Sequence, residues 1–376
     1  NCPNLTALFD HLNVPVKDSE MSFAASLGDG RLEYAGSDIN GLLGQRRNIM
    51  RPAFWRMVAD LMRFYREAPA FLESPEADDM SLGAYLQKYG YGESFIQDHL
   101  LPIGAAIWST SASEMTAYPA AAFIRFFESH GLLSLTKRPQ WRTVAGGSRE
   151  YVQRLTAPYR QKIRFGGAKS IRRAPQAVQV EARNGRVESF DHVVIAAHAD
   201  EAFALLSDPD PLEQDLLGCW RYTKNRAVLH SDPALMPRRR RVWSSWNFVS
   251  GAAGAQDGLC VTYWMNRLQS LASQDPLLVT LNPFRDPKQG SVLYETEYTH
   301  PYFDAKALNA QRRLWSLQGH RRTWFCGSYF GHGFHEDALQ SGLAVAEQLG
   351  GTKRPWSVQN ESGRIFLDAD RPAVAA

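Results

Sequence analysis

The sequence predicts a mixed α/β protein built from two domains. Its 376 residues are more than one hydrophobic core usually organises, so two joined cores are expected. Apolar residues make up 44% of the chain and charged residues 22%, which is the balance of a globular protein rather than a disordered one. Apolar spacing is mainly helical up to residue 135, and strand patterns that alternate with helices follow it.

The helix-rich part covers the first 135 residues. Apolar residues recur there at three-to-four spacing, Pro52 stands at the start of the longest run, and Ser81 is placed as a helix N-cap. These patterns predict helices at 4–14, 52–73, 81–89, 93–107 and 118–130. Residues 21–35 are the exception, because Gly28-Asp29-Gly30 between two short apolar runs predicts a β-hairpin.

Strand patterns begin after Arg142. The pair Gly146-Gly147 predicts a turn into a helix, and residues 163–195 predict three or four strands. Asn184-Gly185 predicts a hairpin turn of type I′ between two of these strands. Residues 193–197 are apolar throughout, so we expect a strand that is buried on both faces and is followed by a helix in a βα unit.

A second sheet is predicted between residues 220 and 300. Runs rich in aromatic and β-branched side chains are separated there by Pro, Gly and Asp turns. After this sheet, residues 323–327 predict a buried strand, and a Gly-rich loop leads into a helix that Gly350-Gly351 ends. The polar residues 353–376 predict a loose tail.

Charge and cysteine content exclude several classes of protein. The net charge of +3 comes from 42 Lys and Arg against 39 Asp and Glu, which argues against a nucleic-acid partner. The four cysteines lie far apart without a C-x-x-C pair, so neither a zinc site nor a disulfide framework is indicated and a reducing cytoplasm is expected. No apolar stretch reaches the roughly 18 residues of a membrane span. The run Arg238–Arg241 predicts a solvated surface or, at most, peripheral contact with anionic lipid headgroups.

The stretch 323–349 is the strongest candidate for a ligand site. A strand ends at Gly327, Gly331 and Gly333 permit close approach of the backbone, and Asp337 stands where a helix begins. Ligands in α/β sheets lie beyond the carboxyl ends of strands, and helix N-termini favour anionic or electron-rich atoms such as a phosphate or a flavin carbonyl. The alternative is a plain βα connection in which Asp337 caps its own helix.

Four separated motifs in this sequence resemble a known family. They are TVAGGSREYVQRL, FDHVVIAAHADEAFALL, VTYWMNRLQ and FCGSYFGHGFHEDALQSG, and together they resemble the flavin-containing amine oxidases. They resemble most closely the bacterial amine-oxidase-like FAD proteins, which are similar to the amino-terminal oxidase-like part of plant cyclopropane fatty acid synthases. The resemblance covers residues 1–351.

The resemblance implies a glutathione-reductase-like FAD domain together with a mixed sheet-and-helix substrate domain. Chains of this family open with a strand and G-x-G-x-x-G, which this sequence lacks, so the FAD domain is expected to be N-terminally truncated. The expected segments are a helix-rich substrate or cap region at 1–140, FAD-domain segments at 141–205 and 319–352, a substrate-domain sheet at 206–318 and a tail at 353–376.

The resemblance also implies which residues contact FAD. The backbone of Ala168 would meet the adenine, and Gly327 would lie near the ribitol and pyrophosphate, where Ser328 replaces an acid that many relatives use. The helix that starts at Asp337 would present its N-terminus to the isoalloxazine ring. The expected cofactor-binding residues are Gly146, Gly147, Ala168, Gly327, Ser328, Asp337, Ala338 and Leu339.

The function that the resemblance implies is that of an FAD-dependent oxidoreductase. It would oxidise or desaturate an apolar or amine substrate, and lipid acyl chains are among the candidates. FAD accepts the hydride, so the protein needs no charged catalytic residue. Candidates for proton relay or substrate anchoring are His332, His335 and Asn266, the last beside the aromatic-rich residues 243–264. Two alternatives are a non-catalytic protein without FAD and a metal-dependent hydrolase that uses His332, His335 and Glu336.

Overall fold

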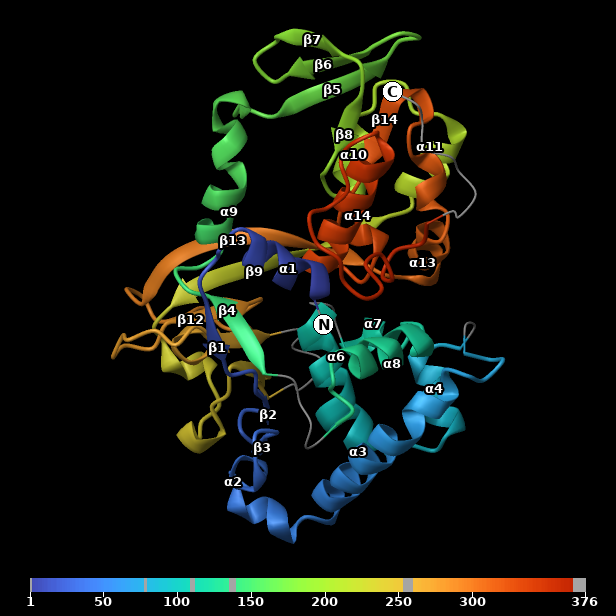
Figure 1. The fold of residues 1–376 in the computed structure, drawn as a ribbon. Helices are drawn as coiled ribbons and strands as arrows, with labels where there is room; N and C mark the ends of the chain where they lie inside the picture. Colours follow the sequence, from blue (N-terminus) through green and yellow to red (C-terminus); the bar gives the residue numbers. More distant parts are fainter. Residues whose placement is uncertain (1, 78–79, 109–111, 135–139, 253–259, 368–376) are drawn as a thin grey trace. The chain divides into compact units, whose positions relative to one another are not determined.

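The computed structural model describes residues 2–77, 80–108, 112–134, 140–252 and 260–367 (Figure 1). The chain divides into two compact units, each assembled from separated segments. Unit 1 comprises residues 1–15, 146–222 and 301–376, and unit 2 comprises residues 16–145 and 223–300. No helix among the described residues is both long enough and apolar enough to cross a membrane.

These units differ from the expected segments at four places. Residues 1–15, 206–222 and 301–318 belong to unit 1 rather than to the cap region or the substrate sheet, and residues 141–145 belong to unit 2 rather than to an FAD-domain segment. The first of these joins unit 1 because the helix α1 (Pro3–His11) packs against α14 (His335–Gln348). Residues 206–222 and 301–318 join it because α11 (Pro211–Leu217) packs against both α10 (Ala199–Leu205) and α13 (Ala305–Gln311).

Unit 2 contains a seven-stranded sheet in the order β13-β9-β12-β11-β10-β2-β3. β2 pairs with β10 in parallel, whereas β2–β3, β10–β11, β11–β12 and β12–β9 are antiparallel pairs. The strands are β2 (Phe23–Leu27), β3 (Leu32–Ala35), β9 (Arg221–His230), β10 (Trp246–Val249), β11 (Val261–Trp264), β12 (Leu278–Leu281) and β13 (Val292–Tyr302). A separate pair is formed by β1 (Val16–Ser19) and β4 (Trp141–Val144).

The hairpin predicted at residues 21–35 is confirmed. β2 and β3 pair Leu27 with Leu32 across the turn. Gly28 and Gly30 adopt φ angles of 56° and 82°, which lie in the left-handed region that glycine enters without steric cost.

The predicted helices of unit 2 are present, and one of them is interrupted. The longest, α3, is Pro52–Phe71, and Ser81 caps α4 (Leu82–Lys88) by accepting a hydrogen bond from the amide of Ala84. Phe64 of α3 lies at the centre of a buried aromatic core. Its ring neighbours are Tyr85, Tyr91, Phe95, Phe123 and Phe127. Unit 2 also contains α2 (Ile39–Leu42), α7 (Ala112–Met115), α8 (Ala120–Ser129) and α12 (Met265–Leu268).

The prediction of one continuous helix at 93–107 is wrong, because the helix is interrupted in its interior. A π-helical turn, η2 (Ile96–Leu100), separates α5 (Glu93–Phe95) from α6 (Leu101–Trp108). Pro102 has no N–H, so it cannot donate to the carbonyl of Asp98 four residues earlier. The hydroxyl of Tyr34 donates to this carbonyl instead, at 2.7 Å.

Unit 1 contains a parallel pair and an antiparallel sheet. The pair is formed by β8 (Val193–Ile195) and β14 (Thr323–Phe325), and the sheet is formed by β5 (Ala168–Arg173), β6 (Val178–Ala182) and β7 (Val187–Phe190). The helix predicted after Gly146-Gly147 is α9 (Arg149–Thr156), and the helix after β8 is α10 (Ala199–Leu205).

Two strand predictions in unit 1 need correction. The turn at Asn184-Gly185 joins β6 and β7 as expected, but only Gly185 adopts a positive φ, of 84°, whereas a type I′ turn needs two such residues. The strand at 193–197 is not buried on both faces, because Val194 is 43% exposed while Ile195 is 4% exposed. β8 pairs only with β14 within the described part of the sheet.

The prediction of a loose tail at 353–376 also needs correction for residues 353–367, which the structure describes. Ile365 is buried, and the guanidinium of Arg354 forms an ion pair with Glu347 of α14 at 2.8 Å. Residues 353–367 therefore pack on unit 1, and residues 368–376 lie outside the described residues.

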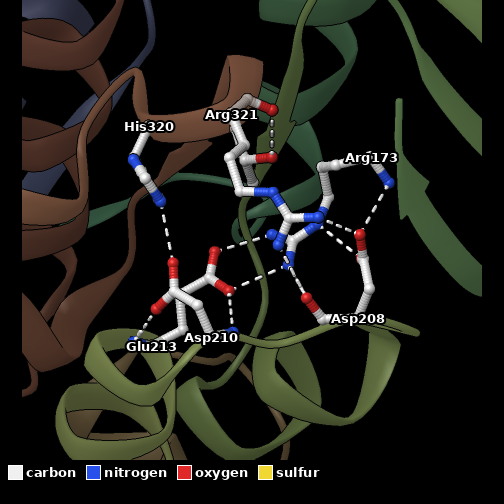
Figure 2. Close-up of polar contacts among 7 residues, drawn as sticks. Arg173, Asp208, Asp210, Glu213, His320 and Arg321 are labelled. Atoms are coloured by element: carbon white, nitrogen blue, oxygen red, sulfur yellow. Dashed lines mark hydrogen bonds and ion pairs between the residues drawn. The ribbon is translucent and has the colours of Figure 1, made fainter. Parts of the chain in front are cut away.

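An ion-pair network centred on the buried side chains of Arg173 and Glu213 joins three parts of unit 1 (Figure 2). Arg173 at the end of β5 donates to both carboxylate oxygens of Glu213 in α11, at 2.6 and 2.8 Å, and through Nε to Asp208 at 2.7 Å. Arg321 also pairs with Asp208, and His320 lies 2.7 Å from the carboxylate of Asp210. The network fixes the start of α11 against β5 and the turn before β14.

Candidate functional site

The carboxyl ends of the parallel strands β8 and β14 lie side by side, and a tight turn at Gly327 follows β14. The amide of Cys326 donates to the carbonyl of Ile195, at 3.2 Å. At Gly327, an added Cβ would lie 2.7 Å from the ring of Tyr329 and 3.3 Å from the carbonyl oxygen of Ala197. A larger residue would therefore push these two segments apart, which explains the glycine at this position.

Ser341 of α14 fastens this turn to the helix. Its hydroxyl accepts from the amide of Gly327 at 3.0 Å and lies 3.1 Å from the carbonyl oxygen of the same residue. Ser328, the next residue, begins a short 3₁₀ helix, η9 (Ser328–Phe330). The end of the strand, the loop and the helix are thus held as one rigid element.

The carboxylate of Asp337 folds back onto the residue that precedes α14. The carboxylate of Asp337 is fully buried and accepts from the amide of Phe334 at 2.8 Å. The amides of Asp337 and Ala338 both donate to the carbonyl of Phe334, at 3.1 and 3.2 Å. Burial raises the pKa of Asp337 above its usual value. The capping role expected from sequence is therefore what this carboxylate performs, and Ala338 and Leu339 lie half-buried beside it.

Gly331 makes room for this buried carboxylate. An added Cβ at Gly331 would lie 2.7 Å from three atoms of the Asp337 side chain. Gly333 adopts a φ of 92°, and an added Cβ there would lie 3.1 Å from the ring of Phe303. The two glycines therefore serve the packing of the loop as well as its conformation.

The remaining predicted cofactor residues also belong to unit 1. Gly146 and Gly147 adopt φ angles of 85° and 84° and lead into α9, so both use the left-handed region that favours glycine. Ala168 is the first residue of β5, is half-buried and pairs with Ala182 of β6. All eight predicted cofactor residues are thus in the same unit.

The structure places the three catalytic candidates in different surroundings. His332 is half-buried and lies near enough to Asp337 to oppose part of the rise in the pKa of that carboxyl that burial causes, whereas His335 is exposed. Asn266 belongs to unit 2, where its amide donates to the carbonyls of Ser273 and Asp275 and accepts from the amide of Leu277 at 2.7 Å. Its amide therefore closes a local loop.

Glu336 does not act as the metal ligand expected in the hydrolase alternative. Its carboxylate accepts from the amide and the side chain of Asn4, from the amide of Leu5 and from the side chain of Gln340, at 2.8–3.1 Å. Among the residues that the structure describes, no three His, Cys, Asp or Glu side chains form a group able to hold a metal ion. The geometry thus argues against the hydrolase.

Tyr329 is a site residue that sequence reasoning missed. Its hydroxyl is buried and has no hydrogen-bond partner within the described parts of the chain. Burial raises its pKa well above the usual value. Its position in the Gly-Ser-Tyr-Phe-Gly run was the available signal, because an aromatic residue between glycines in a ligand loop is placed for contact.

The turn fits a bound flavin nucleotide in two respects. Gly327 lets the backbone after β14 lie closer to Tyr329 and to the carbonyl of Ala197 than any side chain would allow. The hydroxyl of Tyr329 is a buried polar group that needs a partner. Both features lie at the carboxyl ends of parallel strands, where α/β proteins bind nucleotides.

Comparisons with known proteins place the fold. The family profile described as flavin-containing amine oxidoreductase matches residues 3–245. A CLA-producing fatty acid isomerase from P. acnes is similar, with a TM-score of 0.63 at 12% identity over 92% of this chain and 83% of that one. Cyclohexylamine oxidase from Brevibacterium oxydans gives a TM-score of 0.61 at 13% identity over 92% and 85% of the two chains. A putrescine oxidase with redesigned cofactor binding gives 0.60 at 12% identity, with the same coverage of 92% and 85%.

These comparisons confirm the family predicted from the motifs. No curated protein sequence matches the chain. The finer similarity to the oxidase-like part of plant cyclopropane fatty acid synthases stays a prediction, whereas the glutathione-reductase-like mixed α/β fold is that of the structural relatives. Since the family profile covers more than half of the chain, this protein belongs to the flavin-containing amine oxidoreductases, a family of FAD-dependent enzymes.

Proposed function

We propose that this FAD-dependent oxidoreductase removes a hydride from a carbon atom of an apolar substrate, with a lipid acyl chain as the first candidate and an amine as the second. When bound, FAD supplies the hydride acceptor. The acyl class is supported by the fatty acid isomerase among the fold relatives, and the amine class by the cyclohexylamine and putrescine oxidases. We also propose the reducing cytoplasm as its location, from the spacing of the cysteines.

The observation that carries this proposal is the fastened turn at Gly327. Ser341 holds the turn to α14, so the backbone beyond β14 is rigid before a cofactor arrives. We assign Gly327 and Ser328 to the ribitol and pyrophosphate and the α14 N-terminus to the flavin ring. The remaining residues that we assign to the cofactor are Gly146, Gly147, Ala168, Asp337, Ala338 and Leu339.

Unit 2 supports the apolar class of substrate. Trp246 of β10 and Tyr263 of β11 lie edge to face, with ring centroids 5.1 Å apart. The indole N–H of Trp246 is buried without a partner within the described residues, and burial raises the pKa of Tyr263 to about 12. A hydrophobic surface with few polar groups is typical of pockets for apolar ligands.

His332 is our candidate for handling a proton at this site, in preference to His335. It is half-buried and lies near the buried carboxylate of Asp337, whereas His335 is exposed. Asn266 is the weaker anchor, because its amide is already bonded within its own loop. In this role, His332 would hold or release a proton while the carbon centre is oxidised.

The first experiment measures FAD binding to the purified chain. We expect FAD to raise the melting temperature of the wild type and to elute with it as protein-bound flavin. The variant Ser341→Ala frees the turn at Gly327 and should weaken FAD binding at least tenfold. Gly342→Ala is the matched control, because an added Cβ there meets nothing within 4 Å and should leave FAD binding unchanged.

The outcome distinguishes the two remaining hypotheses. Folded wild-type protein that shows no thermal shift and no bound flavin would support the non-catalytic alternative. Equal FAD binding by Ser341→Ala and wild type would remove the Gly327 turn from the site. With flavin bound, anaerobic bleaching by fatty acids but not by alkyl amines would select the acyl class, and the reverse result would select the amine class.

A further inference from the structure

One surface of unit 2 combines exposed apolar side chains with arginines. Residues 39–59 contain four arginines and no acidic residue, and Arg238–Arg241 form an uninterrupted basic run. We call this surface the Arg–Met patch. It comprises Arg31, Ile39, Arg46, Arg47, Ile49, Met50, Arg51, Trp55, Arg56, Arg238, Arg239, Arg240 and Arg241, all of which belong to unit 2.

The apolar members of the patch are strongly exposed. Met50 is 86% exposed and Ile39 is 75% exposed, while Ile49 and Trp55 are 47% and 45% exposed. Met50 and Ile49 end the 3₁₀ helix η1 (Arg46–Met50), and Ile39 begins α2, which directly precedes η1 along the chain. Such a concentration of exposed apolar side chains indicates an interaction surface.

Hydrogen bonds hold the members of the patch together. The guanidinium groups of Arg47 and Arg51 both donate to the carbonyl of Arg31, at 2.9 and 2.8 Å. The indole N–H of Trp55 donates to the carbonyl of Ile49 at 2.8 Å, which keeps the ring beside η1. The side chains of two arginines and of the tryptophan are therefore held by backbone carbonyls.

The basic run at 238–241 joins the same surface through α2. The turn η5 (Arg240–Val242) packs against α2, and an added Cβ at Gly44 would lie 2.5 Å from Val242 and 3.5 Å from Arg241. Arg239 reaches the buried Glu33 at 2.6 Å.

The arginines of the patch outnumber the carboxylates that pair with them. The carboxylates of Asp29, Glu33 and Asp98 each pair with one arginine, and that of Asp38 caps α2. Arg46, Arg56 and Arg241 have no acidic partner among the described residues. The pKa of Arg51 is lowered by burial and by the nearby charges of Arg47, Arg31 and Arg239, as expected within a basic cluster.

We propose that the Arg–Met patch docks this protein on a bilayer surface that contains anionic phospholipids. Met50, Ile39, Ile49 and Trp55 enter the boundary between headgroups and acyl chains, and the arginines around them contact lipid phosphates. Basic side chains beside exposed Trp and aliphatic residues are typical of proteins that lie in this interface. Docking through this patch requires neither bound FAD nor the proposed substrate.

The apolar members of the patch favour a bilayer over other polyanions as its partner. A nucleic acid would satisfy the arginines but would leave the side chains of Met50 and Ile39 without an apolar partner. A bilayer satisfies both kinds of side chain at once, since phosphates lie directly above hydrocarbon. Charge and apolar exposure on the same surface therefore select the bilayer.

The test is co-sedimentation of the full chain with vesicles. We expect binding to vesicles of phosphatidylcholine mixed with phosphatidylserine, little binding to phosphatidylcholine alone, and weaker binding as salt rises. The double variant Arg46→Gln/Arg56→Gln should weaken binding about 25-fold, since each arginine contributes about fivefold. The double variant Ile39→Asp/Met50→Asp should weaken it more, because it also removes the inserted side chains.

Matched controls come from exposed residues elsewhere. Arg149→Gln/Arg172→Gln removes the same charge from unit 1, and Leu293→Asp places an acid on the exposed, glutamate-rich strand β13. Both controls should bind vesicles as the wild type does. Wild-type binding that does not require phosphatidylserine, or variants of the patch that bind as tightly as the controls, would overturn the proposal. Binding to duplex DNA that Ile39→Asp/Met50→Asp leaves intact would assign the arginines to nucleic acid instead.

Discussion

Glu336 shows how one carboxylate can be committed to structure. It accepts hydrogen bonds from the amides of Asn4 and Leu5, which lie in the first turn of α1 and have no acceptor within that helix. Glu336 therefore caps α1 from another segment of the chain. The sequence run around it resembles a set of metal ligands, but the acceptor capacity of the carboxylate is already used.

Replacing this acceptor gives a prediction for stability. Glu336→Gln should lower the free energy of unfolding by about 1–3 kcal/mol, because one carboxylate oxygen becomes an NH2 group, which cannot accept from the backbone amide of Asn4 or of Leu5 at that position. Chemical denaturation measures the difference, and Glu201→Gln, an exposed glutamate in the first turn of α10, is the control. A chelator should not change the melting temperature of the wild type. A clear decrease with chelator would restore the metal hypothesis.

His99 gives a prediction for pH dependence. Burial lowers its pKa from 6.5 to about 4, and its Nδ1 lies 2.9 Å from the hydroxyl of Tyr34. The unfolded chain binds a proton at a higher pH than the native protein does, so stability is complete above pH 6.5 and is lost as the pH falls toward 4. The loss from this residue should reach about 3 kcal/mol.

A histidine variant separates this contribution from other titrating groups. His99→Gln should reduce the slope of unfolding free energy against pH in this window, because glutamine does not titrate. His335→Gln, which changes an exposed histidine, should leave the slope as in the wild type. Equal slopes for wild type and His99→Gln, measured by urea denaturation at several pH values, would contradict the assignment.

At the scale of elements, the Arg173 network decides how α11 meets the sheet of unit 1. The side chain of Arg173 is fully buried and its guanidinium contacts Glu213 and Asp208, which follow it by 40 and 35 residues (Figure 2). A buried charge needs its partners, because the interior does not solvate it.

Removing the arginine gives an element-scale prediction. Arg173→Met should destabilise unit 1 by about 3–5 kcal/mol, since it leaves the buried Glu213 without its ion pair. Lys169→Gln breaks the exposed pair with Glu181 on the same strand and should leave the melting temperature within experimental scatter. Similar melting temperatures for Arg173→Met and Lys169→Gln, by calorimetry, would show that the network contributes little.

At the scale of the whole molecule, local signals in the sequence predicted elements well. The positions of Pro52, Ser81 and Gly28 marked a helix start, a cap and a hairpin that the structure confirms. These signals act within a few residues, so a single sequence contains them in full. The family motifs at 143–155 and 325–342 likewise located the turn before α9 and the loop before α14.

Long-range partners could not be predicted in the same way. The π-helical turn depends on Tyr34 reaching the carbonyl of Asp98, which lies 64 residues away. The role of Glu336 depends on Asn4, which lies 332 residues away. The exposure of Val194 depends on how few strands flank β8, which its apolar neighbours in sequence do not reveal.

The side chain of Asn4 joins two remote ends of the described chain to one helix. Its amide donates to Glu336 at 2.9 Å and to the carbonyl of Glu361, and its oxygen accepts from Arg354 at 3.0 Å. In amide hydrogen exchange, α1, the start of α14 and residues 354–365 should therefore open as one cooperative unit despite their distance in sequence. Asn4→Ala should accelerate deuterium uptake in all three segments together, and acceleration in α1 alone would mean that the three segments open independently.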